Sequence, residues 1–82
     1  MFIKMMNFIM DENNVTEVLK IINKHHKNPI VKNCGWADDV NKWFIMGYIS
    51  VKRYNMIINE LRKNFKLEEK ECRRIYLTKI ES

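Results

Sequence analysis

Long apolar stretches alternate with short polar breaks along this chain, and the clearest periodic pattern lies in residues 15–26. Asn14, three residues before Glu17, matches a capping box at the start of this segment. Pro29 disfavours helical backbone at the residue before it, so the segment is predicted to end as a helix near residue 26. Apolar residues recur along one helical face: Val15, Val18, Leu19 and Ile22.

A second predicted helix, residues 51–65, has the longest apolar stripe. Ser50 is a good N-cap for it. The stripe covers about one third of a helical circle at 100° per residue, and Lys52, Lys63 and Lys66 fall on the opposite side, with Arg62 at the border. The stripe consists of Tyr54, Ile57, Ile58, Leu61 and Phe65.

Residues 38–46 are predicted to form the helix before it. Asp38 and Asp39 suit a helix start, where carboxylates cap the chain and meet the positive end of the dipole. Gly47 can take the left-handed conformation that ends a helix. The two helices together predict a helix–turn–helix hairpin with Val40, Trp43 and Phe44 facing inward.

The two ends of the chain are ambiguous between helix and strand. In residues 2–10 the apolar positions fit one helical face, but they also fit a strand with both faces apolar. Residues 74–80, RIYLTKI, are rich in strand formers yet also fit a helix. Helices are favoured at both ends, with a small two-stranded sheet that joins the termini as the alternative.

These patterns predict one mostly α domain, residues 1–82, built as a bundle of three to five short helices around the helical hairpin. The alternative is an α+β fold with the small terminal sheet. A chain of 82 residues is too short to divide into two domains that each hold a core. The predicted core consists of Val18, Leu19, Ile22, Val40, Trp43, Phe44, Tyr54, Ile58, Leu61 and Phe65.

Composition narrows the setting of the protein. The formal charge of +5 and the pI near 9.4 fit an anionic partner such as a nucleic acid or an acidic protein surface. Residues 1–10 fall far short of the ~20 that a membrane span needs, and they lack the features of a secretion signal. Two cysteines are too few for a secreted disulfide framework. We therefore expect a soluble cytoplasmic protein.

Metal or catalytic chemistry is not indicated, and no cofactor is expected. His25, His26, Cys34 and Cys72 match none of the compact spacings of zinc ligands. No nucleophile, base and acid arrangement is legible, and the two glycines are too far apart for a phosphate loop. The sequence thus predicts a protein that is not an enzyme.

Two kinds of binding fit the pattern. In a helix–turn–helix DNA-binding protein, the side chains that face phosphates or bases would be Ser50, Lys52, Arg53, Asn55 and Asn59, and Arg62, Lys63 and Lys66 would extend the phosphate contacts. Trp43, however, stands where such proteins usually keep a small residue. In a protein-binding domain, the same basic residues would meet acidic groups, and exposed aromatic and Met side chains would anchor the contact. Those anchors are predicted at helix ends and turns: Trp36, Met46 and Tyr48.

Residues 35–57, GWADDVNKWFIMGYISVKRYNMI, resemble the XkdX-like proteins of phage and prophage tail regions. The family pattern has a glycine, an aromatic residue, a short acidic helix start with valine, Phe-Val, a second glycine, Ile-Thr and a tyrosine four residues later. The resemblance covers about a quarter of the chain, and it implies a phage-type origin and a non-catalytic binding role. The matching residues are Gly35, Trp36, Asp38, Asp39, Val40, Trp43, Phe44, Gly47, Ile49, Ser50 and Tyr54.

The sequence-level hypothesis is therefore a small non-enzymatic binding protein, derived from a phage or another mobile element, that docks on a protein partner or on a second copy of itself. By analogy of size, inhibition of a host defence system in the manner of anti-CRISPR proteins is one such role. Binding of DNA through helix 51–65 is the alternative.

Overall fold

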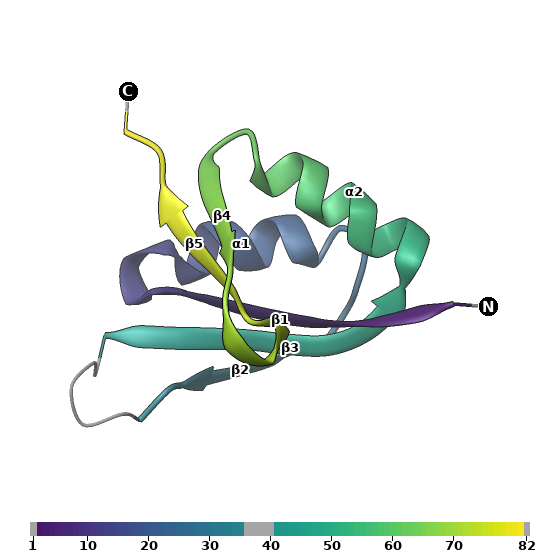
Figure 1. Ribbon diagram of the computed structural model, residues 1–82, viewed down its shortest axis with the longest axis horizontal. Helices are drawn as coiled ribbons and strands as arrows, with labels where there is room; N and C mark the ends of the chain where they lie inside the picture. Colours follow the sequence, from purple (N-terminus) through teal and green to yellow (C-terminus); the bar gives the residue numbers. More distant parts are fainter. Residues whose placement is uncertain (1, 36–40, 82) are drawn as a thin grey trace.

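The computed structural model describes residues 2–35 and 41–81, which form a five-stranded mixed sheet with two α-helices (Figure 1). This α+β fold contradicts the predicted mostly helical bundle. The elements follow in the order β1 (Ile3–Asp11), α1 (Val15–Ile22), β2 (Ile30–Asn33), β3 (Lys42–Ser50), α2 (Val51–Leu61), β4 (Phe65–Glu69) and β5 (Ile75–Lys79), with 3-10 turns at Glu12–Asn14 and Glu71–Arg73.

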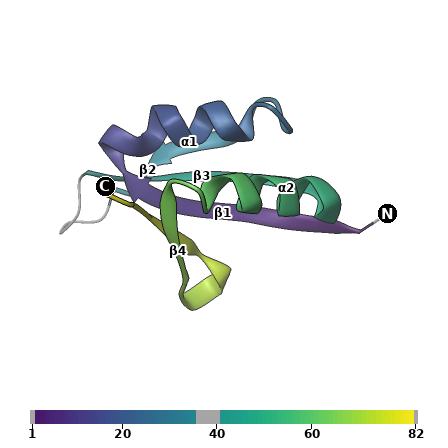
Figure 2. The same ribbon diagram turned by 90° about the horizontal axis from the view of Figure 1, so that it is seen from above.

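The strands lie in the order β2-β3-β1-β5-β4. β1 is antiparallel to β3 along its whole length, from Ile3 opposite Ser50 to Asp11 opposite Lys42. β5 is parallel to β1 and pairs with it only at Phe8 and Ile9. The antiparallel β4–β5 hairpin therefore meets β1 near the middle of that strand and turns away from its N-terminal half, as Figures 1 and 2 show.

Both helices cover the same face of the sheet (Figures 1 and 2). Met6, Phe8 and Met10 of β1 point toward the helices and are buried, which is the alternation of a strand. One ion pair joins the two layers, because Lys79 of β5 lies 2.6 Å from Glu17 of α1; a second, between Lys24 just after α1 and Glu60 of α2, links the two helical segments. The hydrogen bond from Lys24, aided by its charge, lowers the pKa of the Glu60 carboxyl.

Four of the predicted helices require correction. Of the helices predicted at the two ends, residues 3–10 lie in strand β1 and residues 75–79 in strand β5, and most of the predicted helix 38–46 is strand β3 or lies outside the described residues. No helix–turn–helix hairpin exists in the part of the chain that the structure describes. The predicted helix 51–65 ends at Leu61, so Phe65 reaches the core from strand β4 instead.

The termini do pair as strands, but within the five-stranded sheet rather than in the small two-stranded sheet of the alternative prediction. The reason for the misreading is that the apolar runs in β1 and β3 are almost continuous. A continuous run contains residues at helical spacing and at strand spacing alike, so periodicity alone cannot separate the two.

The capping predictions had mixed outcomes. Ser50 is confirmed as the N-cap of α2, because its hydroxyl accepts a hydrogen bond from the Arg53 amide at 3.3 Å. Asn14 precedes α1, but its side chain makes no capping bond. Gly47 does not end a helix: it lies within β3, where an added Cβ would come 3.0 Å from His26 Nε2 and 3.2 Å from the Met6 methyl group. A side chain at this position would therefore require the His26 ring and the Met6 methyl group to shift by a few tenths of an ångström.

The predicted core was partly wrong. Trp43 and Phe44 are only half-buried, Leu19 packs against the core from its margin, and Val40 lies outside the described residues. Six predicted members are buried in the core cluster: Val18, Ile22, Tyr54, Ile58, Leu61 and Phe65. The sheet supplies the remaining centre of this core through Met6, Phe8, Met10, Ile45, Ile49, Ile75 and Leu77.

Candidate functional site

The face of the sheet that carries no helix bears a set of apolar side chains among polar ones. Successive strand residues point to opposite faces, and Met6 and Phe8 face the helices, so Met5 and Ile9 must face away from them. The registers place Phe44, Met46 and Tyr48 on this same face. We call it the open sheet face; its apolar members in the described residues are Ile3, Met5, Ile9, Ile30, Phe44, Met46, Tyr48 and Tyr76.

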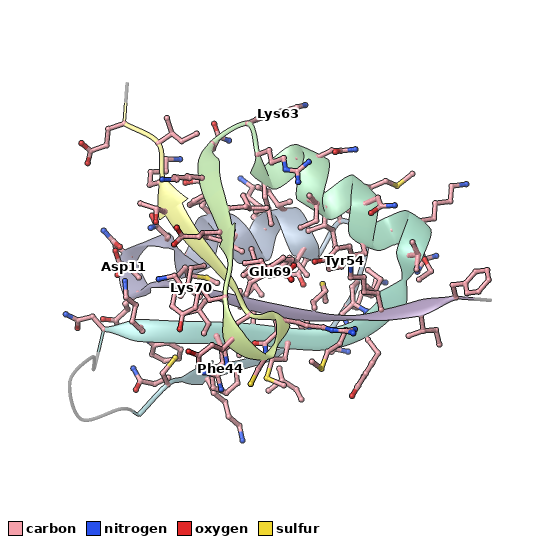
Figure 3. All side chains as sticks on the ribbon, viewed as in Figure 1. Asp11, Phe44, Tyr54, Lys63, Glu69 and Lys70 are labelled. Atoms are coloured by element: carbon pink, nitrogen blue, oxygen red, sulfur yellow. The ribbon has the colours of Figure 1, made fainter. Side chains whose placement is uncertain are left out.

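The open sheet face has a packed centre and an exposed margin. Ile9 is 1% exposed although it lies outside the core cluster, and its cross-strand neighbours are Phe44 and Tyr76. Tyr48 is 70% exposed and Ile30 is 52% exposed. Figure 3 shows Phe44 on the side of the sheet away from the helices. Apolar side chains from four strands thus form one surface that water reaches.

Charged groups surround these apolar side chains with an excess of lysine. Lys32 of β2 and Lys66 of β4 share the face by register and are exposed. Lys42 pairs with Asp11 across β1 and β3, and Lys70 lies 3.4 Å from Glu68. Among the described residues, these four lysines outnumber the two carboxylates, an excess that favours contact with acidic groups.

The structure separates the residues that the sequence analysis grouped as one binding face. Lys52 and Arg53 lie in the first turn of α2, and Arg62 and Lys63 lie at its end, so these four belong to the helical layer. Lys66 and Tyr48 lie on the open sheet face. Trp36 falls outside the described residues. The basic stripe predicted along a helix 51–65 is therefore divided between the two layers.

Several members of the open sheet face were missed by the sequence analysis. Phe44 was placed in the core, and Met5, Ile30 and Lys32 were not singled out. The sequence did contain a signal for this face. If residues 42–50, KWFIMGYIS, form a strand, apolar residues stand on both of its faces, and strands of that kind are usually covered on both faces. The two helices cover one of these faces, so the second set of apolar residues has no helix over it among the described residues.

A groove of about 480 Å³ lies on the helical side of the molecule, between α2 and the β4–β5 hairpin. Tyr54 and Glu69 lie on its two sides (Figure 3). The Lys4 ammonium lies 4.5 Å from the centre of the Tyr54 ring, and Phe8 stacks on that ring from the core. The groove is lined by Lys4, Tyr54, Asn55, Ile58, Asn59, Arg62, Leu67, Glu69 and Ile75.

Tyr54 makes the stability of the domain sensitive to alkaline pH. Burial, with a smaller effect from the Glu69 carboxylate, raises the pKa of the Tyr54 phenol above its ordinary value of 10.0, against the opposing charge of Arg62. The neutral phenol is thus favoured in the folded state. Its contribution is complete below pH 10 and is lost as the pH rises through the folded-state pKa.

We therefore expect the free energy of unfolding to fall more steeply for the wild type than for Tyr54→Phe between about pH 8 and about pH 11. Urea unfolding of both proteins at the two pH values measures this difference. The exposed Tyr48→Phe variant serves as the control and should lose stability in parallel with the wild type. Parallel loss in Tyr54→Phe as well would show that Tyr54 does not carry the effect.

Other chemistry finds little support in the described residues. They contain no group of three or more His, Cys, Asp or Glu side chains positioned to hold a metal ion. His25 and His26 follow α1, Cys34 follows β2, and Cys72 lies between β4 and β5. Neither described helix has the length and hydropathy needed to cross a bilayer.

Comparison with family models, with curated proteins and with solved structures finds no match for this chain. The resemblance of residues 35–57 to the XkdX-like proteins therefore stays a prediction. Within that segment, residues 42–50 are strand β3 and residues 51–57 begin helix α2. The function proposed for this protein rests on the geometry of its surfaces.

Proposed function

We propose that this chain is a non-enzymatic binding protein that docks on a protein partner through the open sheet face. The observation that carries the proposal is the set of apolar side chains that β1, β2, β3 and β5 present where no described helix covers the sheet. Exposed apolar patches of this kind mark interaction sites. Tyr48 and Met46 belong to residue types that anchor protein interfaces.

The partner is proposed to be acidic around its contact area. Lys32 and Lys66 stand on the margin of the patch, where their charges speed and orient the encounter with an acidic surface. The patch itself supplies the desolvated centre of the contact, as in other protein interfaces. Occlusion of a partner's surface is also the action that an inhibitor of a host defence system requires, and that role and a phage origin remain part of the proposal.

A protein partner fits this face better than a nucleic acid does. Bases are bound on sheets by stacking on exposed aromatic rings. Here much of the patch is not aromatic but consists of Met5, Met46 and Ile30. The Tyr76 ring already has the Lys70 ammonium 4.6 Å from its centre, where a stacked base would lie. A helix–turn–helix DNA-binding protein presents its recognition helix from a helical hairpin. Here α2, the helix predicted for that role, follows strand β3 and not a second helix.

Site-specific photocrosslinking tests this proposal. A photoreactive phenylalanine analogue replaces Tyr48 in one variant and Met56 in the other; both are exposed apolar residues, but Met56 lies on α2. In cells that express the chain, a discrete protein adduct is expected from position 48 and not from position 56. Adducts from both positions, from position 56 alone, or with nucleic acid alone would contradict the proposal.

A further inference from the structure

The turn that follows α1 and the start of α2 together line a pocket of about 460 Å³ that is rich in basic side chains. Figure 1 shows this turn close to the first turns of α2. Among the described residues, none of those that line the pocket is Asp or Glu. We call it the basic pocket; its lining residues are Asn23, Lys24, His25, His26, Lys27 and Arg53.

Arg53 is held in the wall of this pocket by contacts of its backbone and of its side chain. Its backbone amide donates to the Ser50 hydroxyl at 3.3 Å, and its Nη1 lies 3.5 Å from the His25 carbonyl oxygen. A guanidinium has five N–H donors in a fixed, planar arrangement, so most of them stay available for a ligand. Two parallel hydrogen bonds from such a group fit the oxygens of a phosphate.

The His26 imidazole packs against strand β3 at the position where that strand has a glycine. A Cβ added at Gly47 would come 3.0 Å from His26 Nε2. Glycine weakens the interior of a strand, and it often marks a site that another group approaches closely. Here Gly47 gives room to the half-buried imidazole, which is thereby held between the sheet and the basic pocket.

Glu60 of α2 stands beside the basic pocket, but its carboxylate is already engaged. Its Oε1 pairs with Lys24 Nζ, and its Oε2 lies 4.0 Å from His25 Nε2. Among the described residues, Lys27 and Arg53 have no carboxylate oxygen within 4.0 Å. Even with both histidines neutral, the pocket therefore retains the two positive charges of Lys27 and Arg53, which attract an anion of the matching charge.

A second pocket, of about 330 Å³, adjoins the basic pocket, because His26 and Arg53 line both of them. The lining of this adjoining pocket is more apolar, since it includes Ile3, Tyr48 and Ile49. A strongly cationic pocket and a partly apolar one thus meet at His26 and Arg53. This arrangement fits an anion that carries an apolar body.

We propose that the basic pocket binds the phosphate group of a small phosphate monoester, whose organic part enters the adjoining pocket. A phosphate monoester has a charge of about −1.5 to −2 at pH 7 and three strong acceptor oxygens. That charge matches the two cations, Lys27 and Arg53, that no described carboxylate neutralises. Their N–H groups, with the imidazole of His26, supply hydrogen-bond donors for the three oxygens.

The surroundings of the basic pocket favour a small ester over a nucleic-acid backbone. Each phosphodiester carries one negative charge, and a bound strand needs cations along successive phosphates. Here the Glu60 carboxylate stands on one side of the basic pocket, and Ile3 and Ile49 line the pocket that adjoins it. The described cations therefore converge on one hollow rather than follow a strand.

Titration of the full chain with phenyl phosphate, followed by NMR of the backbone amides, tests this site. Saturable shifts are expected at the Lys27 and Arg53 amides, with a Kd of about 1 mM or lower. Arg53→Gln should weaken binding by about tenfold or more, because it removes charge-assisted hydrogen bonds to the phosphate. Lys63→Gln is the matched control: it removes one positive charge just beyond the end of α2, outside both pockets, and should change the Kd by less than about twofold.

Two further probes distinguish the class of ligand. Benzoate has the same ring with a single negative charge, and an oligothymidylate without terminal phosphates offers phosphodiesters alone. Both should bind about tenfold or more weakly than phenyl phosphate does. The proposal would be overturned by the absence of saturable shifts with phenyl phosphate, by equal affinity for benzoate, or by an Arg53→Gln variant that binds as the wild type does. Tighter binding of the oligothymidylate at the same amides would assign the basic pocket to nucleic acid and would also reject it.

This inference does not rest on the proposed function, because Lys27 and Arg53 are not members of the open sheet face. The two fail separately. A chain that binds phenyl phosphate but gives no protein adduct at position 48 contradicts only the proposed function. A chain that gives the adduct but does not bind phenyl phosphate contradicts only the phosphate site.

Discussion

Truncation of Ile45 to alanine should lower the free energy of unfolding by about 2–5 kcal/mol, whereas truncation of Tyr48 should lower it by less than about 1 kcal/mol. Ile45 is fully buried beneath the helices, while Tyr48 is 70% exposed on the open sheet face. The Ile45→Ala change leaves a cavity in a core that packs against both helices. In a domain of this size, such a loss is a large part of the total stability.

The Ile45→Ala variant also tests the correction of the predicted helix 38–46, whose inward residues were Val40, Trp43 and Phe44 and did not include Ile45. Chemical denaturation of both variants, with the slope of the transition compared to confirm a common unfolded state, gives the two values. Similar losses in Ile45→Ala and Tyr48→Ala would contradict strand β3 as described.

Local signals in the sequence predicted where α1 and α2 begin, although α1 ends at Ile22 and not near residue 26. The apolar stripe from Val18 to Ile22 and the Ser50 cap depend on residues within one or two turns, so a local pattern contains the information. The end of α2 was harder, because Phe65 continues the helical stripe by spacing while it lies in β4. Phe65 faces the core both in the predicted helix and in the observed strand β4, so only the type of element was wrong.

The strands and the open sheet face depend on pairing between distant residues. Met5 and Tyr48 are neighbours because β1 and β3 pair in one register, and nothing within either segment specifies that register. The apolar runs in both strands were read as helical stripes, which hid the fact that each strand has two apolar faces. The groove likewise joins α2 to the β4–β5 hairpin and has no local sequence signature.

The second large effect is expected for Tyr48→Glu, which should weaken binding to the protein that crosslinks at position 48 by about 10- to 100-fold. Two effects act together. The substitution removes an exposed aromatic anchor, and it places a carboxylate in a patch whose lysines are proposed to meet acidic groups. Folding should be unaffected, because Tyr48 contributes little buried area; circular dichroism and urea unfolding of the variant verify this.

Met56→Glu provides the matched control for charge and for loss of an exposed apolar residue. Met56 is 45% exposed on α2, on the opposite side of the molecule from the open sheet face. If charge or solubility alone governed binding, both glutamate variants would lose affinity to the same extent. If the open sheet face is the binding surface, only Tyr48→Glu should lose affinity.

The central claim is that the helix-free face of the sheet is the binding surface. Calorimetric titration tests it most directly, with the protein that crosslinks at position 48 titrated against wild type, Tyr48→Glu and Met56→Glu. The expected result is at least a tenfold loss of affinity for Tyr48→Glu and an affinity within about twofold of wild type for Met56→Glu. Equal affinities for the wild type and Tyr48→Glu, or a greater loss for Met56→Glu, would contradict the claim.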